Sequence, residues 1–178
     1  MADQLKNKNI LMFVDDVYED LELWYPKLRL LEAGASVVVA GPKAEAKYLG
    51  KHGYPAVSDV AIADINADHF HGVICVGGFA PDKLRRDPKV KELVSLFSQR
   101  AQLVAAICHG GWIPISAGVY RGVRVTGSLG IKDDLVNAGA IWVDAPSVTD
   151  RYFVSSRKPD DLPAFCEAVL EVLKIHSK

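Results

Sequence analysis

One ten-residue stretch, LVAAICHGGW at positions 103–112, ends an apolar run on residues that could do chemistry. Cys108 is a potential nucleophile, His109 is a potential base, and two glycines follow them. A nucleophile on a sharp strand-to-helix turn needs small residues two places before and two places after it. Ala106 and Gly110 occupy those places. The spacing therefore predicts a nucleophile elbow at Cys108.

The three cysteines of the chain differ in their surroundings. A thiol at the start of a helix feels the positive end of the helix dipole, and free backbone N–H groups there can also bind an oxyanion, so we expect Cys108 to be reactive. Cys75 lies inside the apolar run GVICVGG and Cys166 lies on an apolar helix face, which is typical of core residues. The odd number and the absence of CxxC spacing predict neither a disulfide framework nor a zinc knuckle.

Two further polar segments follow predicted strands on the same side of the sheet. The first is DDVYED at 15–20, and acids near a helix start typically cap it, as we expect of Asp15, Asp16 and Asp20. One acid of this cluster could instead turn toward the thiol, and its carboxyl, with a raised pKa, would then donate a hydrogen bond to sulfur. The second is VGGFAPD at 76–82, which lacks a phosphate-binding glycine pattern and is interpreted as a turn that serves the site.

The histidines outside the elbow offer a weaker metal hypothesis. His69 and His71 would project to one side of an extended segment, but a solvated approach to the next strand is the interpretation we favour. His52, in GKHGYP, is interpreted as a loop residue. The sequence therefore predicts no metal and no cofactor.

Short apolar runs alternate with amphipathic segments along the chain, which predicts a doubly wound α/β sandwich with a mostly parallel sheet. Pro26 predicts a kink or a delayed start in the first helix, and the segment 42–64 is expected to be a loop with short edge strands. Because no linker composition occurs, residues 1–178 are expected to form a single domain. The predicted strands are 9–14, 36–40, 72–76, 103–107 and 123–126, with a further pair at AIWVD and YFVSS. The predicted helices are 19–33, 87–101, 112–117, 131–138 and 161–175.

Composition excludes several classes of partner. The chain has 178 residues, of which 21 are Lys or Arg and 22 are Asp or Glu, so no basic surplus exists for nucleic acid or an anionic membrane. We find neither an apolar run long enough to span a membrane nor a signal peptide, and we therefore expect a cytoplasmic protein.

Several motifs in a fixed order resemble the ThiJ/PfpI family, within the class I glutamine-amidotransferase-like superfamily, over nearly the whole chain. These motifs are YEDLELWYP at 18–26, GKHGY at 50–54, VGGFAPD at 76–82, AICHG at 106–110, SAGVYRG at 116–122, GIKDDLVNAGAIWVD at 130–144 and SSRKPDDLPAF at 155–165.

The resemblance implies a flavodoxin-like three-layer sandwich and a role for each matched residue. Cys108 would be the nucleophile, His109 the base, and Glu19 the carboxylic acid that is hydrogen-bonded to the thiolate. Asp82, where the family usually has glutamate, would orient His109 from a neighbouring subunit, so a homodimer or larger homo-oligomer is implied. Gly78 and the His109 amide match the oxyanion-binding positions. The Gly-Gly-Trp sequence after His109 departs from the family, in which proline is frequent there.

The resemblance implies a cysteine-dependent hydrolase or lyase with one of two substrate classes. Family members act on small carbonyl compounds or their adducts, as glyoxalases or deglycases, or on peptides, as intracellular peptidases, and we favour the small-molecule chemistry. The alternative is a non-catalytic oxidative-stress sensor or chaperone-like protein in which Cys108 is oxidised. Amidotransferase activity is disfavoured because the chain has no downstream HxE pair.

Overall fold

The seven-stranded sheet at the centre of the molecule is parallel except at one edge. The structure, a computed structural model, describes residues 4–175. The strand order is β10-β11-β7-β6-β1-β2-β5, and the β10–β11 pair is antiparallel. The strands of this sheet are β1 (Asn9–Phe13), β2 (Ser36–Gly41), β5 (Val60–Ala61), β6 (Gly72–Cys75), β7 (Leu103–Ile107), β10 (Ser147–Asp150) and β11 (Phe153–Ser156).

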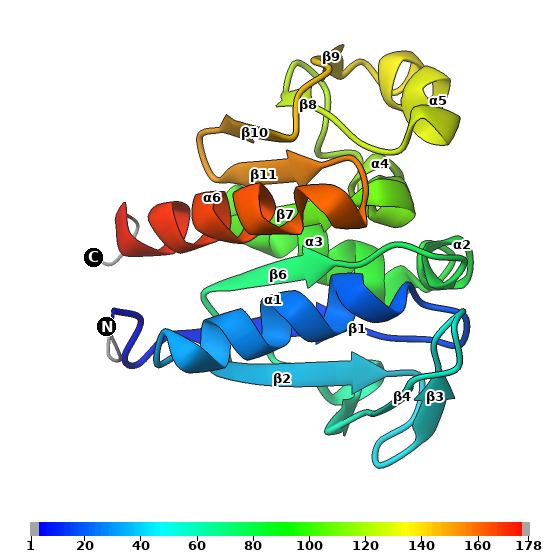
Figure 1. Ribbon diagram of the computed structural model, residues 1–178, viewed down its shortest axis with the longest axis vertical. Coiled ribbons are helices and arrows are strands. Elements are labelled where there is room, and N and C mark those ends of the chain that lie inside the picture. The colour runs from blue at the N-terminus through cyan, green and yellow to red at the C-terminus, as the bar shows by residue number, and fades with distance from the viewer. Residues whose placement is uncertain (1–3, 176–178) are drawn as a thin grey trace.

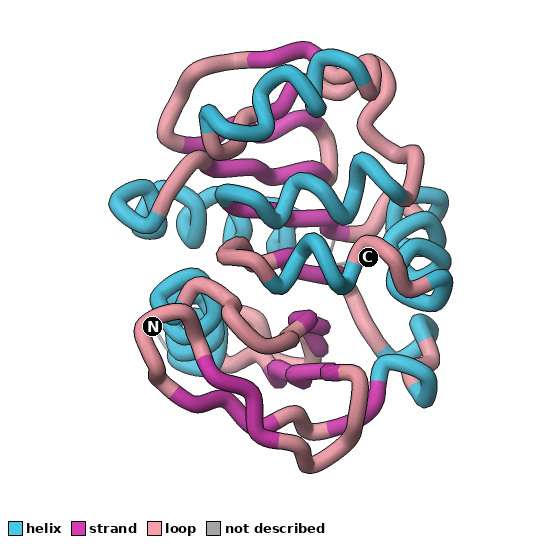
Figure 2. Tube along the Cα trace, turned by 90° about the vertical axis from the view of Figure 1, so that its right-hand side faces the viewer, coloured by secondary structure: helices cyan, strands magenta, loops and turns pink. Residues whose placement is uncertain are grey.

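Helices cover both faces of this sheet and complete the flavodoxin-like sandwich. Figure 1 shows α1 and α6 in front of the sheet and α3 behind it. The view turned by 90° shows helices on both sides of the strands (Figure 2). The helices are α1 (Asp20–Glu32), α2 (Ala80–Leu84), α3 (Pro88–Gln99), α4 (Trp112–Ser116), α5 (Lys132–Asn137) and α6 (Leu162–Ile175). None of the helices in the described part of the chain is long and apolar enough to cross a membrane.

The central strands form where continuous apolar runs are buried on both faces, as the sequence predicts for parallel strands. All five residues of β7 and all four of β6 are buried, and the two strands pair in register from Gly72 opposite Leu103 to Cys75 opposite Ala106. Because the inner strands are parallel, their carboxyl ends meet at one edge, on the right in Figure 1. The loops that follow β1, β6 and β7 gather at this edge, so the predicted site residues are brought to one place.

Three details of the predicted elements differ from the structure. The runs AIWVD and YFVSS do not pair with each other: β9 (Ile141–Trp142) pairs with β8 (Arg124–Val125), and β11 pairs with β7 and β10. The strand β10 has a polar sequence, SVTD, that carries no apolar run to predict it. Pro26 does not delay the start of α1, which runs from Asp20 to Glu32 with the proline inside it. The kink expected at Pro26 stays a prediction.

The segment 42–64 forms the expected short edge strands. The hairpin of β3 (Lys47–Leu49) and β4 (Pro55–Val57) is antiparallel, and β5 extends the main sheet beside β2. The tip of this hairpin lies against the start of α1, since a bridge pairs Tyr18 with Gly50.

Candidate active site

Cys108 lies on a sharp turn between β7 and the 3₁₀ helix Cys108–Gly111 that leads into α4. Its φ is +58°, in the left-handed region that few non-glycine residues adopt. A Cβ on Gly110 would collide with the carbonyl oxygen of Cys75, so only glycine fits two places after the cysteine. The sharp strand-to-helix turn predicted from Ala106 and Gly110 is therefore confirmed, and the nucleophilic role of Cys108 stays a prediction.

His109 contacts the sulfur directly, which its position in the sequence alone does not guarantee. The Cys108 Sγ lies 3.2 Å from the His109 Nδ1, and both residues are half-buried. The left-handed backbone at Cys108 allows the two adjacent side chains to lie side by side. Burial lowers the pKa of His109, and the charge of Lys51 lowers it further, so the imidazole is neutral at pH 7 and can accept a proton.

Two backbone amides converge on the sulfur. The N–H groups of His109 and Gly78 both hydrogen-bond to Cys108, and each lowers the pKa of its thiol. Gly78 has φ +81°, and a Cβ there would lie 2.5 Å from the Glu19 nitrogen and from the Val17 oxygen. The sequence thus places glycine where the backbone must approach the site closely. The two amides that the family resemblance assigns to the oxyanion lie together.

The carboxyl group beside the thiol belongs to Glu22, not to Glu19, which corrects the expectation from the resemblance. Glu22 is fully buried, accepts a hydrogen bond from the Gly77 N–H at 2.7 Å, and is hydrogen-bonded to Cys108. Burial raises the pKa of Glu22 to about 8, and the nearby charge of Glu19 also raises it. Glu22 is therefore protonated at neutral pH and can donate a hydrogen bond to sulfur.

Glu19 instead caps α1. Its backbone is extended, and its Oε2 accepts the Glu22 N–H at 3.0 Å, which turns the carboxylate back toward the helix. The Glu19 Oε1 lies 3.7 Å from the His52 Nε2. Glu22 lies one turn later, inside the helix, and its side chain therefore faces the carboxyl end of the sheet.

The ionisation of Cys108 depends on that of Glu22. Burial raises the pKa of the Cys108 thiol, and a charged Glu22 raises it further, against the two amides that lower it. The helix dipole expected to activate the thiol is weak here, because α4 has only five residues and follows a 3₁₀ turn. With Glu22 protonated, the repulsion disappears and the carboxyl group stabilises the thiolate instead. A thiolate at Cys108 therefore requires a protonated Glu22.

Asp20 lies in the first turn of α1, as expected of an acid near a helix start, and Asp20 and Asp16 also bind the β3–β4 hairpin. The two carboxylate oxygens of Asp20 accept the N–H groups of His52 and Tyr54, each at 2.9 Å. The Asp16 Oδ1 accepts the Leu49 N–H, also at 2.9 Å. These acids hold the tip of the β3–β4 hairpin beside the site. They thereby place Lys51 where its charge lowers the pKa of both Glu22 and His109. The motif GKHGY, taken alone, does not predict this effect of Lys51.

Asp82 does not contact His109 within one chain. Its carboxylate is half-exposed and forms an ion pair with Arg86 at 2.6 Å. No carboxylate of residues 4–175 is hydrogen-bonded to His109 in this single subunit. A contact from a neighbouring subunit therefore stays a prediction.

The remaining cysteines and histidines lie away from the reacting sulfur. Cys75 and Cys166 are buried in the core, as expected, and burial raises the pKa of both thiols. The His71 Nδ1 accepts the Asn9 N–H at 3.1 Å. Within residues 4–175, the group with metal-ligand spacing is Glu19, Asp20 and His52, but both Asp20 oxygens are already bonded to backbone N–H groups.

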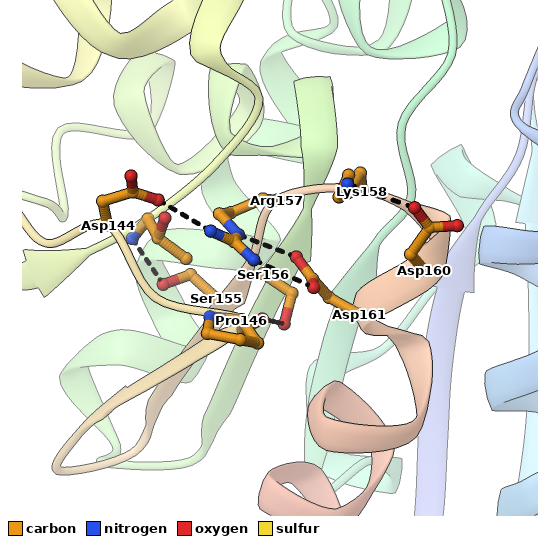
Figure 3. A network of polar contacts seen from close by, with 9 residues as sticks. Asp144, Pro146, Ser155, Ser156, Arg157, Lys158, Asp160 and Asp161 are labelled. Carbon is orange, nitrogen blue, oxygen red and sulfur yellow. Dashed lines mark hydrogen bonds and ion pairs between the residues drawn. The ribbon is translucent and has the colours of Figure 1, made fainter.

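Arg157, which follows β11, lies in a network of polar contacts (Figure 3). Arg157 donates hydrogen bonds to both oxygens of the buried Asp161, at 2.9 and 3.2 Å, and to Asp144 at 2.8 Å. It joins the start of α6 to the segment after β9. This segment lines a cavity of about 280 Å³ together with the loop 127–129, whose Ser128 N–H donates to the Cys108 carbonyl at 3.2 Å. Arg157 and Asp144 of the network thus line the same cavity as the loop that is bonded to the elbow.

Several known proteins are similar to this chain over nearly its whole length. The DJ-1/PfpI family model matches residues 8–172. A deglycase from Pyrococcus abyssi is 44% identical over 165 residues, which cover 93% of this chain and 99% of the relative. A Bacillus subtilis protein named Putative cysteine protease YraA is 40% identical over 168 residues, covering 94% and 99%. A two-domain protein from Anabaena variabilis, with DJ-1/ThiJ/PfpI-like and ferritin-like domains, superposes with a TM-score of 0.91 at 36% identity, covering 93% of this chain and 48% of that protein.

Proposed function

Because the chain belongs to the DJ-1/PfpI family, we propose that it is a cysteine-dependent hydrolase or lyase of small carbonyl compounds or their adducts. The observation that carries the proposal is the contact between the Cys108 Sγ and the His109 Nδ1 at 3.2 Å, with two amides and the buried Glu22 on the same sulfur. Addition to a carbonyl needs a nucleophile, a base and an oxyanion site close together. The deglycase name of the Pyrococcus abyssi relative supports this substrate class.

A 2-oxoaldehyde such as methylglyoxal illustrates the reaction. The Cys108 thiolate adds to the aldehyde carbon, a C–S bond forms, and the carbonyl π electrons move to oxygen, where the amides of Gly78 and His109 stabilise the charge. His109 takes the proton from this carbon and returns it to the neighbouring carbon, and Glu22 supplies a proton to the oxygen of that neighbouring carbon. The first oxygen thereby becomes the carbonyl oxygen of a thioester. The resulting thioester is hydrolysed by water, which releases a 2-hydroxy acid and regenerates the thiol.

Peptide hydrolysis is the second candidate, and the name of the Bacillus subtilis relative supports it. A cavity of about 650 Å³ lies between α1 and the tip of the β3–β4 hairpin, lined by Leu21, Trp24, Leu28 and Tyr54 among others. Its apolar wall would suit a substrate side chain. The same thiolate, base and amides would serve acyl transfer from a peptide.

The first test compares purified wild-type protein, Cys108→Ala and the matched control Cys166→Ala. Each is incubated with methylglyoxal, and formation of lactate is measured, with a fluorogenic peptide set assayed in parallel. We expect Cys108→Ala to lower the rate by roughly a thousandfold or more, and Cys166→Ala to keep it. Turnover of peptides without lactate formation would assign the second candidate.

A second measurement separates catalysis from sensing. Alkylation of Cys108 by iodoacetamide is followed by peptide mass spectrometry across pH, with the buried Cys75 and Cys166 as internal controls. We expect selective modification of Cys108. If Cys108 is alkylated and oxidised by peroxide but no substrate turns over, the proposed enzyme function is wrong and the sensor alternative stands.

A further inference from the structure

Trp112 lies where His109 needs support. A catalytic imidazole has to be held in one orientation, commonly by a hydrogen bond from a third group. In the described part of one chain, the hydrogen-bonding contact of His109 is the one to Cys108, and Asp82 is paired with Arg86 instead. Within one chain, the orientation of the imidazole therefore depends on contacts other than a carboxylate hydrogen bond.

The indole ring of Trp112 packs against that imidazole. The two ring centroids are 5.1 Å apart and the planes are inclined at 67°, which is the T-shaped arrangement that aromatic rings favour. Trp112 opens α4, three residues after His109, so the elbow itself brings the two rings together. Both residues are half-buried, which leaves the contact intact while the site stays accessible.

Two other elements hold Trp112 in place. Its Nε1 donates a hydrogen bond to the Asp134 Oδ2 of α5 at 2.8 Å. The guanidinium of Arg85, which follows α2, lies 5.4 Å from the centre of the indole ring. Arg85 is itself held by Ser116, whose Oγ accepts a hydrogen bond from its Nε at 2.8 Å. The indole is thus fixed by a carboxylate and by a cation on separate elements.

We propose that Trp112 is the positioning residue of His109 and that Asp134 acts through it by holding the indole. The contact restricts the imidazole to the orientation in which Nδ1 faces the Cys108 sulfur, and leaves Nε2 toward Gly130, where a Cβ would lie 3.5 Å from it. This role rests on the proposed function of His109 as the base. It gives a reason for tryptophan at a position where the motif departs from its family.

The test uses five forms of the full chain: wild type, Trp112→Leu, Trp112→Phe, Asp134→Ala and the matched control Asp133→Ala. Asp133 is an exposed neighbour in the same first turn of α5, so its removal changes the helix charge equally. The pH titration of every histidine is followed by NMR on protein with labelled imidazoles, together with the alkylation rate of Cys108. His69 and His71, which precede β6, report on global changes.

We expect Trp112→Leu to shift the titration of His109 upward, because the imidazole becomes better hydrated, and to lower Cys108 alkylation by roughly two- to tenfold, the range expected for loss of one aromatic pair. Asp134→Ala should act in the same direction with a smaller effect. Trp112→Phe retains a ring and should recover most of the wild-type behaviour, and Asp133→Ala should match wild type.

An unchanged His109 titration in folded Trp112→Leu would overturn the proposal, as would equal effects of Asp134→Ala and Asp133→Ala. If Trp112→Leu does not fold, the comparison of Asp134→Ala with Asp133→Ala still tests the proposal. Equal melting temperatures of these two variants would show that both are folded. The NMR readout needs no turnover. Failure to convert methylglyoxal would therefore count against the proposed function alone, and an unchanged His109 in an active enzyme would count against the role of Trp112 alone.

Discussion

Replacement of Glu22 by glutamine should change how the stability of the protein depends on pH. Glutamine has nearly the same shape, and its amide oxygen can still accept the Gly77 N–H. It cannot ionise. The comparison is made in a Cys108→Ser background, because this removes the titration of the neighbouring thiol and leaves Glu22 as the titrating member of the pair.

The magnitude follows from the burial of Glu22. Burial raises its pKa to about 8 in the folded protein, against about 4.3 in an unfolded chain, a difference of about 5 kcal/mol between the two protonation states. Between these values the unfolded chain has lost the proton while the folded protein retains it, so the free energy of unfolding falls as pH rises. The slope is about 1.4 kcal/mol per pH unit, and it ends near the folded pKa.

The assay is urea unfolding of Cys108→Ser and Cys108→Ser/Glu22→Gln at several pH values from 5 to 8.5. We expect the stability of the glutamate form, relative to the glutamine form, to fall by up to about 4 kcal/mol over this range. The other titrating groups are common to both proteins and cancel. Parallel pH dependences, with a relative change below about 1 kcal/mol, would refute the assignment of a buried, protonated Glu22.

Three further outcomes test other parts of the molecule. Gly78→Ala should lower the free energy of unfolding in urea by at least about 2 kcal/mol, because a Cβ there meets backbone atoms. Gly118 also has a positive φ but has no atom within 4 Å of a Cβ, so Gly118→Ala should lower it less. Equal losses would contradict the close approach of the backbone at Gly78. Arg157→Lys should lower the melting temperature more than the exposed control Arg151→Lys does, because lysine cannot bridge Asp161 and Asp144 with one planar group. A smaller decrease than that of the control would mean that the network is dispensable for stability. If Asp82 acts across the interface of the predicted homodimer, mixing Cys108→Ala and Asp82→Ala subunits should restore up to about a quarter of the wild-type sites, because half of the dimers are mixed and each has one intact site. No recovery of activity after confirmed subunit exchange would argue against a role of Asp82 across the interface.

The central fold is predictable because its strands carry a strong signal. Parallel strands buried on both faces must be apolar throughout, and β1, β6 and β7 are therefore visible as short continuous runs. The edge strand β10 is half-exposed and polar, so its pairing is decided by its neighbour β11 rather than by its own sequence. For the same reason the partners of β9 and β11 are not recoverable from the runs alone.

The elbow is predictable from local sequence, but the acid that supports it is not. Cys108, His109 and Gly110 are adjacent, so their types and spacing already restrict the turn. Glu19 and Glu22 are both acids near the start of one helix, and the sequence does not say which of them lies outside the first turn. The structure decides this through capping: whichever carboxylate accepts the N–H groups of the first turn cannot also face the sheet.

The different positions of Glu19 and Glu22 also affect the pKa of Glu22. Glu19 caps the helix start, its Oε1 lies 3.7 Å from the His52 Nε2, and its charge raises the pKa of Glu22. Glu22, one turn deeper, is desolvated and keeps its proton. The cap therefore helps to hold Glu22 in the neutral form that can donate to the Cys108 thiolate. Both acids are buried, and their functions differ because Glu19 accepts an N–H of the first helical turn whereas Glu22 faces the sulfur.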